Sequence, residues 1–110
     1  MSQLKEYKHT TTPMTDDTVW TGAVPPGYEL EKIIFVESAG HAATLDLGTT
    51  SGAHDVFEQV VIAASSITTV VINKTFSMLA RQTLYLSDDG AGTWNGASLT
   101  AILLMRMVMI

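Results

Sequence analysis

The distribution of apolar and polar residues along this chain is typical of short strands. The clearest examples are ELEKIIFVE at 29–37 and ATLDLG at 43–48, where leucine, β-branched and aromatic side chains alternate with polar ones. In the second segment we expect the leucines to face the interior and Thr44 and Asp46 to face outward. In the first, strict alternation predicts two faces, with Leu30, Lys32, Ile34 and Val36 on one and Glu29, Glu31, Ile33, Phe35 and Glu37 on the other.

Four further segments complete the pattern. SSITTVVINKTF at 65–76 and QTLYLSD at 82–88 also alternate. VFEQVVIAA at 56–64 is ambiguous, because Asp55 could cap a helix whereas the Val-Val-Ile run disfavours one. The last run, from 99 to 110, is apolar on both faces of a strand and nearly all round a helix, so either structure must be covered on every side. We favour a strand for both ambiguous segments.

The spacing of these segments indicates an all-β fold. They recur every 10 to 14 residues or so and are separated by turn residues such as Pro25-Pro26-Gly27. This predicts a single β-sandwich or jelly roll of about seven or eight antiparallel strands over residues 19–110. Residues 1–18 are polar and threonine-rich and contain Pro13, so we expect an extended N-terminal arm or edge segment there, with a disordered terminus as the alternative.

The composition indicates that the domain buries surface against partners. The chain has 110 residues, of which 46% are hydrophobic and only 15% charged, against about 25% charged in a typical soluble domain. The final segment is the natural place for such a contact. Methionine adapts to irregular gaps at binding surfaces. We therefore assign one face of that segment to an interface between copies, formed by Leu103, Met105, Met107 and Met109.

Charge, hydropathy and cysteine content argue against several classes of function. The net charge of −5 and six scattered Lys and Arg residues disfavour nucleic-acid binding, which needs clustered cations. The run at 99–110 contains Thr100 and Arg106 and is shorter than the roughly 20 residues of a membrane-spanning helix. Residues 1–12 are polar, so we expect no secretion signal and synthesis in a cytoplasm. The chain has no cysteine and hence no thiolate chemistry.

The stretch SDDGAGTWNGASL at 87–99 has the residues of a binding loop. Asp88, Asp89 and Asn95 offer two or three oxygens, whereas Ca²⁺ takes six to eight. Asp-Gly and Asn-Gly favour turns, so a connection between strands is the simpler interpretation. Trp94 would pack into the core or an interface between copies, where tryptophan is enriched, whereas an exposed Trp94 beside Asn95 would suit stacking on a sugar ring. Glycan binding, on the host surface for example, by Asp88, Asp89, Trp94 and Asn95 is therefore kept as the alternative function.

No residue pattern predicts catalysis. His9, His41 and His54 lie at no metal-ligand spacing. His54 is followed by Asp55, yet the chain contains no G-x-S-x-G nucleophile motif. We expect no catalytic residue, no metal and no cofactor, and hence a protein that is not an enzyme.

Several motifs together resemble one class of protein. Four segments are similar, in residue pattern and in order along the chain, to segments of small all-β virion proteins of tailed bacteriophages: YELEKIIFVESAG, LDLGTTSG, TLYLSDDG and W-NGASLTAILLM. Such proteins decorate heads or form head fibres and tail attachments. The resemblance implies a non-enzymatic structural protein of the virion, a homotrimer that contacts capsid or tail proteins through its arm. It carries over no catalytic residue.

Overall fold

The computed structural model of the chain describes residues 3–8, 18–88 and 97–108. These residues form strands and turns and contain no helix. They therefore include no helix that is long and apolar enough to cross a membrane. The strands are β1 (Gln3–Lys8), β2 (Thr18–Val24), β3 (Tyr28–Glu37), β4 (Ala43–Gly48), β5 (Phe57–Ile62), β6 (Ile67–Thr75), β7 (Gln82–Asp88) and β8 (Leu99–Met107).

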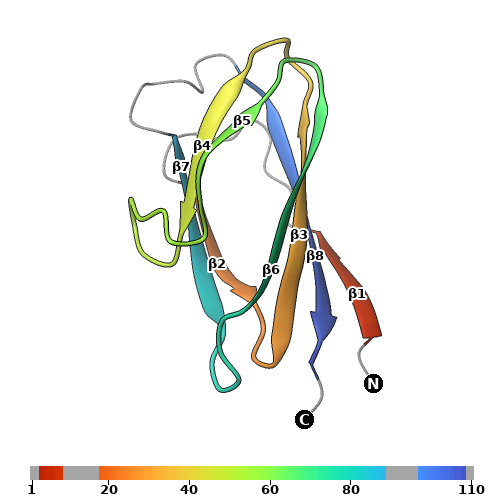
Figure 1. Cartoon of the computed structure of the whole chain (residues 1–110), viewed down its shortest axis with the longest axis vertical. Helices are drawn as coiled ribbons and strands as arrows, with labels where there is room; N and C mark the ends of the chain where they lie inside the picture. The colour runs from red at the N-terminus through yellow and green to blue at the C-terminus, as the bar shows by residue number, and fades with distance from the viewer. Residues whose placement is uncertain (1–2, 9–17, 89–96, 109–110) are drawn as a thin grey trace.

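The strands form two four-stranded sheets that face each other (Figure 1). Sheet A has the order β1-β8-β3-β6 and sheet B the order β2-β7-β4-β5. Four antiparallel pairs are nested along the chain: β4 with β5, β3 with β6, β2 with β7 and β1 with β8. A long hairpin rolled up in this way into two sheets is a jelly roll. The predicted fold class is confirmed.

Both segments that the sequence leaves ambiguous are strands. Residues 57–62 form β5 at the edge of sheet B, and residues 99–107 form β8 in the middle of sheet A. The expected arm is not wholly separate from the domain. Its residues Gln3–Lys8 form β1, which pairs with β8 from Gln3 opposite Met107 to Lys8 opposite Ile102.

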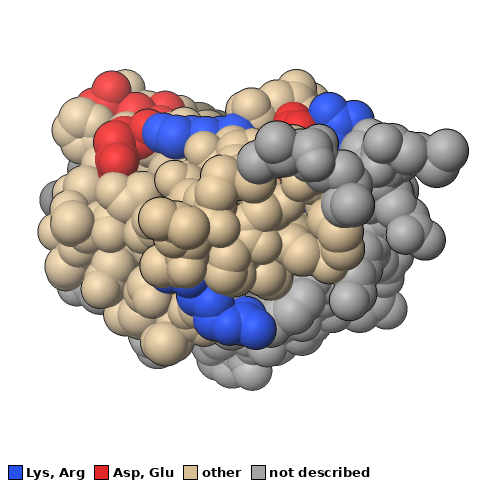
Figure 2. All heavy atoms as spheres, turned by 90° about the horizontal axis from the view of Figure 1, so that it is seen from below, with Lys and Arg blue, Asp and Glu red and all other residues tan. Residues whose placement is uncertain are grey.

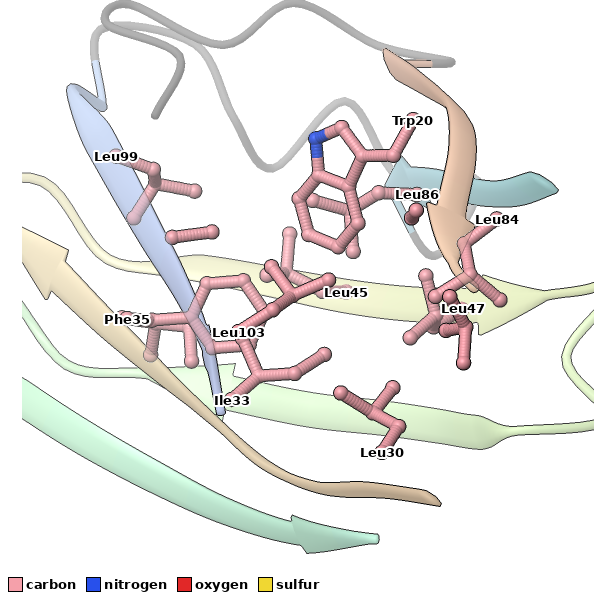
Figure 3. Close-up of a cluster of buried hydrophobic side chains, with 14 of the residues drawn as sticks. Trp20, Leu30, Ile33, Phe35, Leu45, Leu47, Leu84, Leu86, Leu99 and Leu103 are labelled. Atoms are coloured by element: carbon pink, nitrogen blue, oxygen red, sulfur yellow. The ribbon is translucent and has the colours of Figure 1, made fainter. Parts of the chain in front are cut away.

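The space between the sheets is filled by apolar side chains from both of them (Figure 3). Trp20 of β2 and Phe35 of β3 are the largest fully buried members. Leucines and isoleucines from both sheets surround them, namely Leu30, Ile33, Leu45, Leu47, Ile62, Leu84, Leu86, Leu99 and Leu103. Tight packing of this kind leaves the outer surfaces of the sheets, and not the interior, to contact other molecules.

A β-bulge in β3 overturns the strict alternation predicted for that strand. Leu30 pairs with Met105 of β8 and Lys32 with Leu104, so Glu31 is one residue more than β8 offers. Such an extra residue shifts the phase of the strand. Leu30 and Ile33 are therefore both buried, although the alternating pattern placed them on opposite faces.

Asp46 of β4 is also more buried than predicted, with 8% of its surface exposed. It faces a bulge in the neighbouring β5, where Gln59 adopts a φ of 54°. The backbone N–H of Gln59 donates a hydrogen bond of 2.8 Å to the Asp46 carboxylate. The acid therefore satisfies a backbone donor that the bulge removes from the sheet.

Candidate interaction surface

An apolar patch covers the outer face of sheet A. Alternation along β8 and register with its neighbours place six aliphatic side chains there, which we call the sheet A patch: Ile34 and Val36 of β3, Ile102 and Leu104 of β8, and Ile67 and Val71 of β6. Lys32 of β3 lies on the same face, between Leu104 and Val71. Ile67 is 73% exposed and Val71 67% exposed, and the other four are partly exposed. Ile34 lies opposite Ile102, and Val36 lies opposite Ile67, so the patch runs across three adjacent strands.

The patch arises because β8 is apolar on both of its sides. Its inward residues Leu99, Ala101, Leu103 and Met105 are fully buried, whereas Ile102 and Leu104 point to the outer face. A strand in the centre of an antiparallel sheet usually presents polar side chains to solvent. The outer face of β8 departs from that pattern, because Ile102 and Leu104 present aliphatic side chains there.

The residues that the sequence assigned to an interface occupy different places. Leu103 is 0% exposed and Met105 is 1% exposed, so both are core residues and are withdrawn from the expected contact between copies. Met107, at the end of β8, is 37% exposed. Met109 lies outside the described residues. Alternation shows which side chains of β8 share a face but not which face is outward. The outward face of β8 carries Ile102 and Leu104 and not the methionines.

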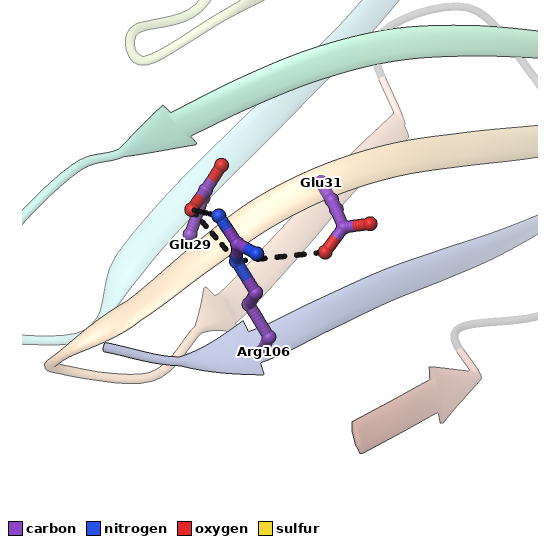
Figure 4. Close-up of polar contacts among 3 residues, drawn as sticks. All are labelled: Glu29, Glu31 and Arg106. Atoms are coloured by element: carbon purple, nitrogen blue, oxygen red, sulfur yellow. Dashed lines mark hydrogen bonds and ion pairs between the residues drawn. The ribbon is translucent and has the colours of Figure 1, made fainter. Parts of the chain in front are cut away.

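Charged side chains border the patch where β3 begins and β8 ends (Figure 4). Arg106 contacts Glu29 on the neighbouring strand at 2.9 Å and Glu31 at 3.6 Å. The hydrogen bond from the guanidinium to Glu29, with the charge of that carboxylate, raises the pKa of Arg106. Exposed pairs of this kind contribute little to stability, but they neutralise the guanidinium charge at the edge of an apolar surface.

At the opposite end of sheet A, the carboxylate of Glu37 joins three connections. It is 2% exposed and accepts hydrogen bonds from five backbone N–H groups, those of Ala39, Gly40, His41, Ser65 and Ser98, at 2.8 to 3.1 Å. These donors, led by Ser65, outweigh the effect of burial and hold the pKa of Glu37 at about 2. Glu37 is thus an ionised structural acceptor. Nothing in the sequence indicates this role, since an acid at a strand end is usually solvated.

Two exposed apolar residues lie in the loop between β6 and β7, which is at the lower end of the molecule in Figure 1. Leu79, in the loop between β6 and β7, is 93% exposed, and the adjacent Met78 is 41% exposed. The loop is held by Ser77, whose Oγ accepts the N–H groups of Leu79 and Ala80 at 3.1 Å. Figure 2 views this end, where uncharged side chains occupy the middle of the described surface.

The expected ligand loop falls largely outside the described residues. Asp88 is the last residue of β7 and lies opposite Leu45 of β4. Asp89, Trp94 and Asn95 are not described. Glycan binding by this loop therefore stays a prediction.

The histidines that the structure describes lie on the surface. His41 is exposed in the turn after β3, and His54 is exposed with its Nδ1 3.5 Å from Glu58. Within residues 3–8, 18–88 and 97–108, no group of three or more His, Cys, Asp or Glu side chains could hold a metal ion. His9 lies outside these ranges.

Comparisons with protein-family models, with curated proteins and with solved structures found no match to this chain.

Proposed function

We propose that this chain is a non-enzymatic structural protein that assembles with copies of itself and with other proteins of a virion. The observation that carries the proposal is the sheet A patch, six aliphatic side chains gathered on one outer face around Lys32. Exposed apolar side chains that gather in one area are typical of protein contact surfaces, whereas scattered ones are not.

The core and the fold support an assembly role. Jelly rolls occur in viral capsid domains, in lectins and in cupins, and a fold alone does not choose among such functions. In this chain the space between the sheets is occupied by Trp20, Phe35 and aliphatic side chains. Contacts made on the outside of the sandwich suit it better than a ligand held within.

The virion, the trimeric state and attachment through residues 1–18 come from the resemblance to bacteriophage structural proteins. The low charge content agrees with surfaces that are covered in an assembly. Mass spectrometry of purified particles tests the virion assignment. We expect the chain in stoichiometric amounts in particles and at most in traces in the surrounding lysate. Its absence from particles would contradict the assignment.

Self-assembly is tested by the molar mass in solution. We expect sedimentation equilibrium to give a multiple of the 11.9 kDa chain and Ile102→Lys, in the middle of the patch, to lower that mass. Val61→Lys is the matched control, since Val61 is 61% exposed on β5 of the other sheet. A monomeric wild type, or equal masses for the three proteins, would contradict the assembly.

A further inference from the structure

The two sheets have four edge strands, β1 and β6 in sheet A and β2 and β5 in sheet B. An edge strand presents unpaired backbone groups to any other extended chain, and soluble proteins protect such edges with charges, prolines or bulges. The edge with the least protection is therefore the one most able to pair with a further strand.

Three of the edges carry such protection. The β1 sequence QLKEYK contains three charged residues. Strand β2 loses its register between Trp20 and Val24 and is followed directly by two prolines. Strand β5 is interrupted by the bulge at Gln59.

Strand β6 is different over its first half. The segment Ile67–Val71, with the sequence ITTVV, has no charge and no proline and stays in regular register with β3 from Val36 to Lys32. Its two outermost aliphatic side chains, Ile67 and Val71, are the most exposed members of the sheet A patch. Within the described part of the chain, β6 pairs with β3 alone. This is a regular, uncharged edge with high strand propensity.

The register fixes which backbone groups point away from the sheet. The N–H of Glu37 donates to the carbonyl of Ser66 at 2.9 Å, so these two residues form a hydrogen-bonded pair. Along an antiparallel pair of strands, pairs of residues that are hydrogen-bonded to each other alternate with pairs that are not. Thr68 and Val70 therefore direct their backbone groups toward β3, and the residues between them direct theirs to the open edge. Those residues are Ile67, Thr69 and Val71.

The open segment is symmetric about Thr69. Ser65, with a φ of 49°, and Asn73, with a φ of 52°, end the regular backbone at equal distances on either side of it. In an antiparallel pair of two such segments, Thr69 lies opposite its own copy and Ile67 lies opposite Val71. Cross-strand pairs of β-branched side chains are favourable.

Other registers of the same pair are excluded by the backbone. A shift of one residue would present groups that point toward β3. A shift of two would place Val71 opposite Ser65, or Ile67 opposite Asn73, where the positive φ breaks the ladder. In the symmetric register the two copies of Lys74 lie beyond opposite ends of the paired segment, so the two lysines are kept apart.

We propose that β6 pairs antiparallel with β6 of a second copy, about a twofold axis through Thr69, and so joins two sheets A into one continuous eight-stranded sheet. The sheet A patches of the two copies then meet along the seam between Ile67 and Val71. The inference rests on the proposed function, since it takes the added strand to be a second copy of this chain. In a trimeric protein this twofold contact joins copies of two different trimers.

The variant Thr69→Pro tests the pairing. Proline lacks the N–H that points to the open edge, and an edge strand tolerates it where that group faces solvent. We expect sedimentation equilibrium to show self-association weakened about tenfold or more, with circular dichroism unchanged. Thr69→Ala is the control: it keeps the N–H and should associate like the wild type. A folded Thr69→Pro protein that associates normally overturns the edge pairing, and dissociation of Ile102→Lys in the same series would leave the proposed function standing.

Disulfide cross-linking tests the register independently, because the chain has no cysteine of its own. Facing residues of an antiparallel pair have Cα atoms about 5.5 Å apart, within reach of a disulfide. Thr69→Cys should give a covalent dimer on oxidation, whereas Ile67→Cys and Val71→Cys should do so only when mixed. Thr50→Cys, in an exposed loop, is the control. Absence of the Thr69→Cys dimer overturns the inference and leaves this edge to a strand of another protein.

Discussion

At the scale of single residues, Glu37 is the clearest case of a side chain whose surroundings determine its state. A buried carboxylate destabilises a protein unless hydrogen bonds replace its lost hydration. Five backbone N–H groups do so here, from the turn after β3, the turn before β6 and the residue before β8. The same bonds satisfy donors in segments that have no strand partner. One side chain therefore fixes the arrangement of three connections.

The low pKa of Glu37 predicts how stability depends on pH. The pKa is about 2 in the folded protein and 4.5 for the ordinary group, so the unfolded chain takes up the proton first as the pH falls. The contribution of Glu37 to the free energy of unfolding is complete above about pH 4.5 and is lost progressively toward pH 2. Urea unfolding between pH 7 and pH 2 should show this decline. Glu37→Gln should show a smaller one, because hydrogen bonds from Thr49 still hold the pKa of Asp55 below its ordinary value.

Glu37→Gln should also lower the melting temperature at pH 7. The amide has one acceptor oxygen in place of two and brings its own donors toward backbone N–H groups. Glu58→Gln, at an exposed position on β5, is the control and should melt within a degree or so of the wild type. Calorimetry checks both. Equal melting temperatures for all three proteins would show that the carboxylate does not hold the connections together.

Replacing Leu79, unlike replacing Glu37, should have little effect on stability, since Leu79 is 93% exposed. Leu79→Ser should change the free energy of unfolding by no more than about 0.5 kcal/mol, because the conformation of the loop depends on Ser77. Urea titration provides the measurement. A loss several times larger would mean that Leu79 is buried in the protein in solution.

At the scale of elements, β8 and β3 show what alternation in the sequence can establish. It predicted a strand for β8, and the structure confirms that strand with its two apolar faces. It could not say which face turns inward, because the pattern is apolar on both. The methionines favoured one face as the contact surface, yet Leu103 and Met105 are buried. Only the partner strands, which the sequence does not specify, decide the orientation.

The positions of the β-bulges could not be predicted from the sequence either. Nothing in ELEKIIFVE distinguishes Glu31 as the extra residue, since β3 has no glycine, proline or asparagine at that point. On β6 a weak signal exists, because asparagine tolerates the left-handed backbone that Asn73 adopts. Glu37 was predicted on the face shared with Phe35 and lies there, but its five donors come from segments distant in the sequence. Its role could not be predicted from the strand alone.

Two neighbouring leucines of β8 should separate folding from assembly. Leu103→Ala removes a fully buried side chain and should cost about 2–5 kcal/mol of unfolding free energy. Leu104→Ala, on the outer face, should cost about 1 kcal/mol or less and weaken self-association. Urea unfolding and sedimentation equilibrium on the same samples check both. Similar losses of stability for the two variants would contradict the assigned faces.

At the scale of the whole molecule, nested pairing makes the two ends of the chain depend on each other. Strand β1 covers one edge of β8 along six residue pairs, from Gln3 to Lys8. Without it, the backbone of an apolar central strand would become a sheet edge. The N-terminal segment is therefore part of the structural unit and also a candidate for attachment.

Deletion of residues 1–8 tests this dependence. The shortened protein should melt at a lower temperature and aggregate on heating, because the exposed edge of β8 is long and nearly uncharged. Calorimetry with light scattering measures both effects. Deletion of residues 1–2 alone keeps β1 and is the control. If the protein lacking residues 1–8 melts and scatters like the control, β1 does not protect β8 in solution.

The nested pairing also sets an order of events during synthesis. A ribosome adds about 5–20 residues per second, so several seconds separate the emergence of β1 from that of β8. Strands β1, β2 and β3 each find their partner in the second half of the chain, and β1 finds its partner in the last strand of all. Sheet B needs β7, which ends at Asp88, and sheet A cannot be completed on a nascent chain that ends before residue 99. On a polysome, where neighbouring nascent chains lie close together, the waiting β1 of one chain can meet a finished β8 of another before its own is made.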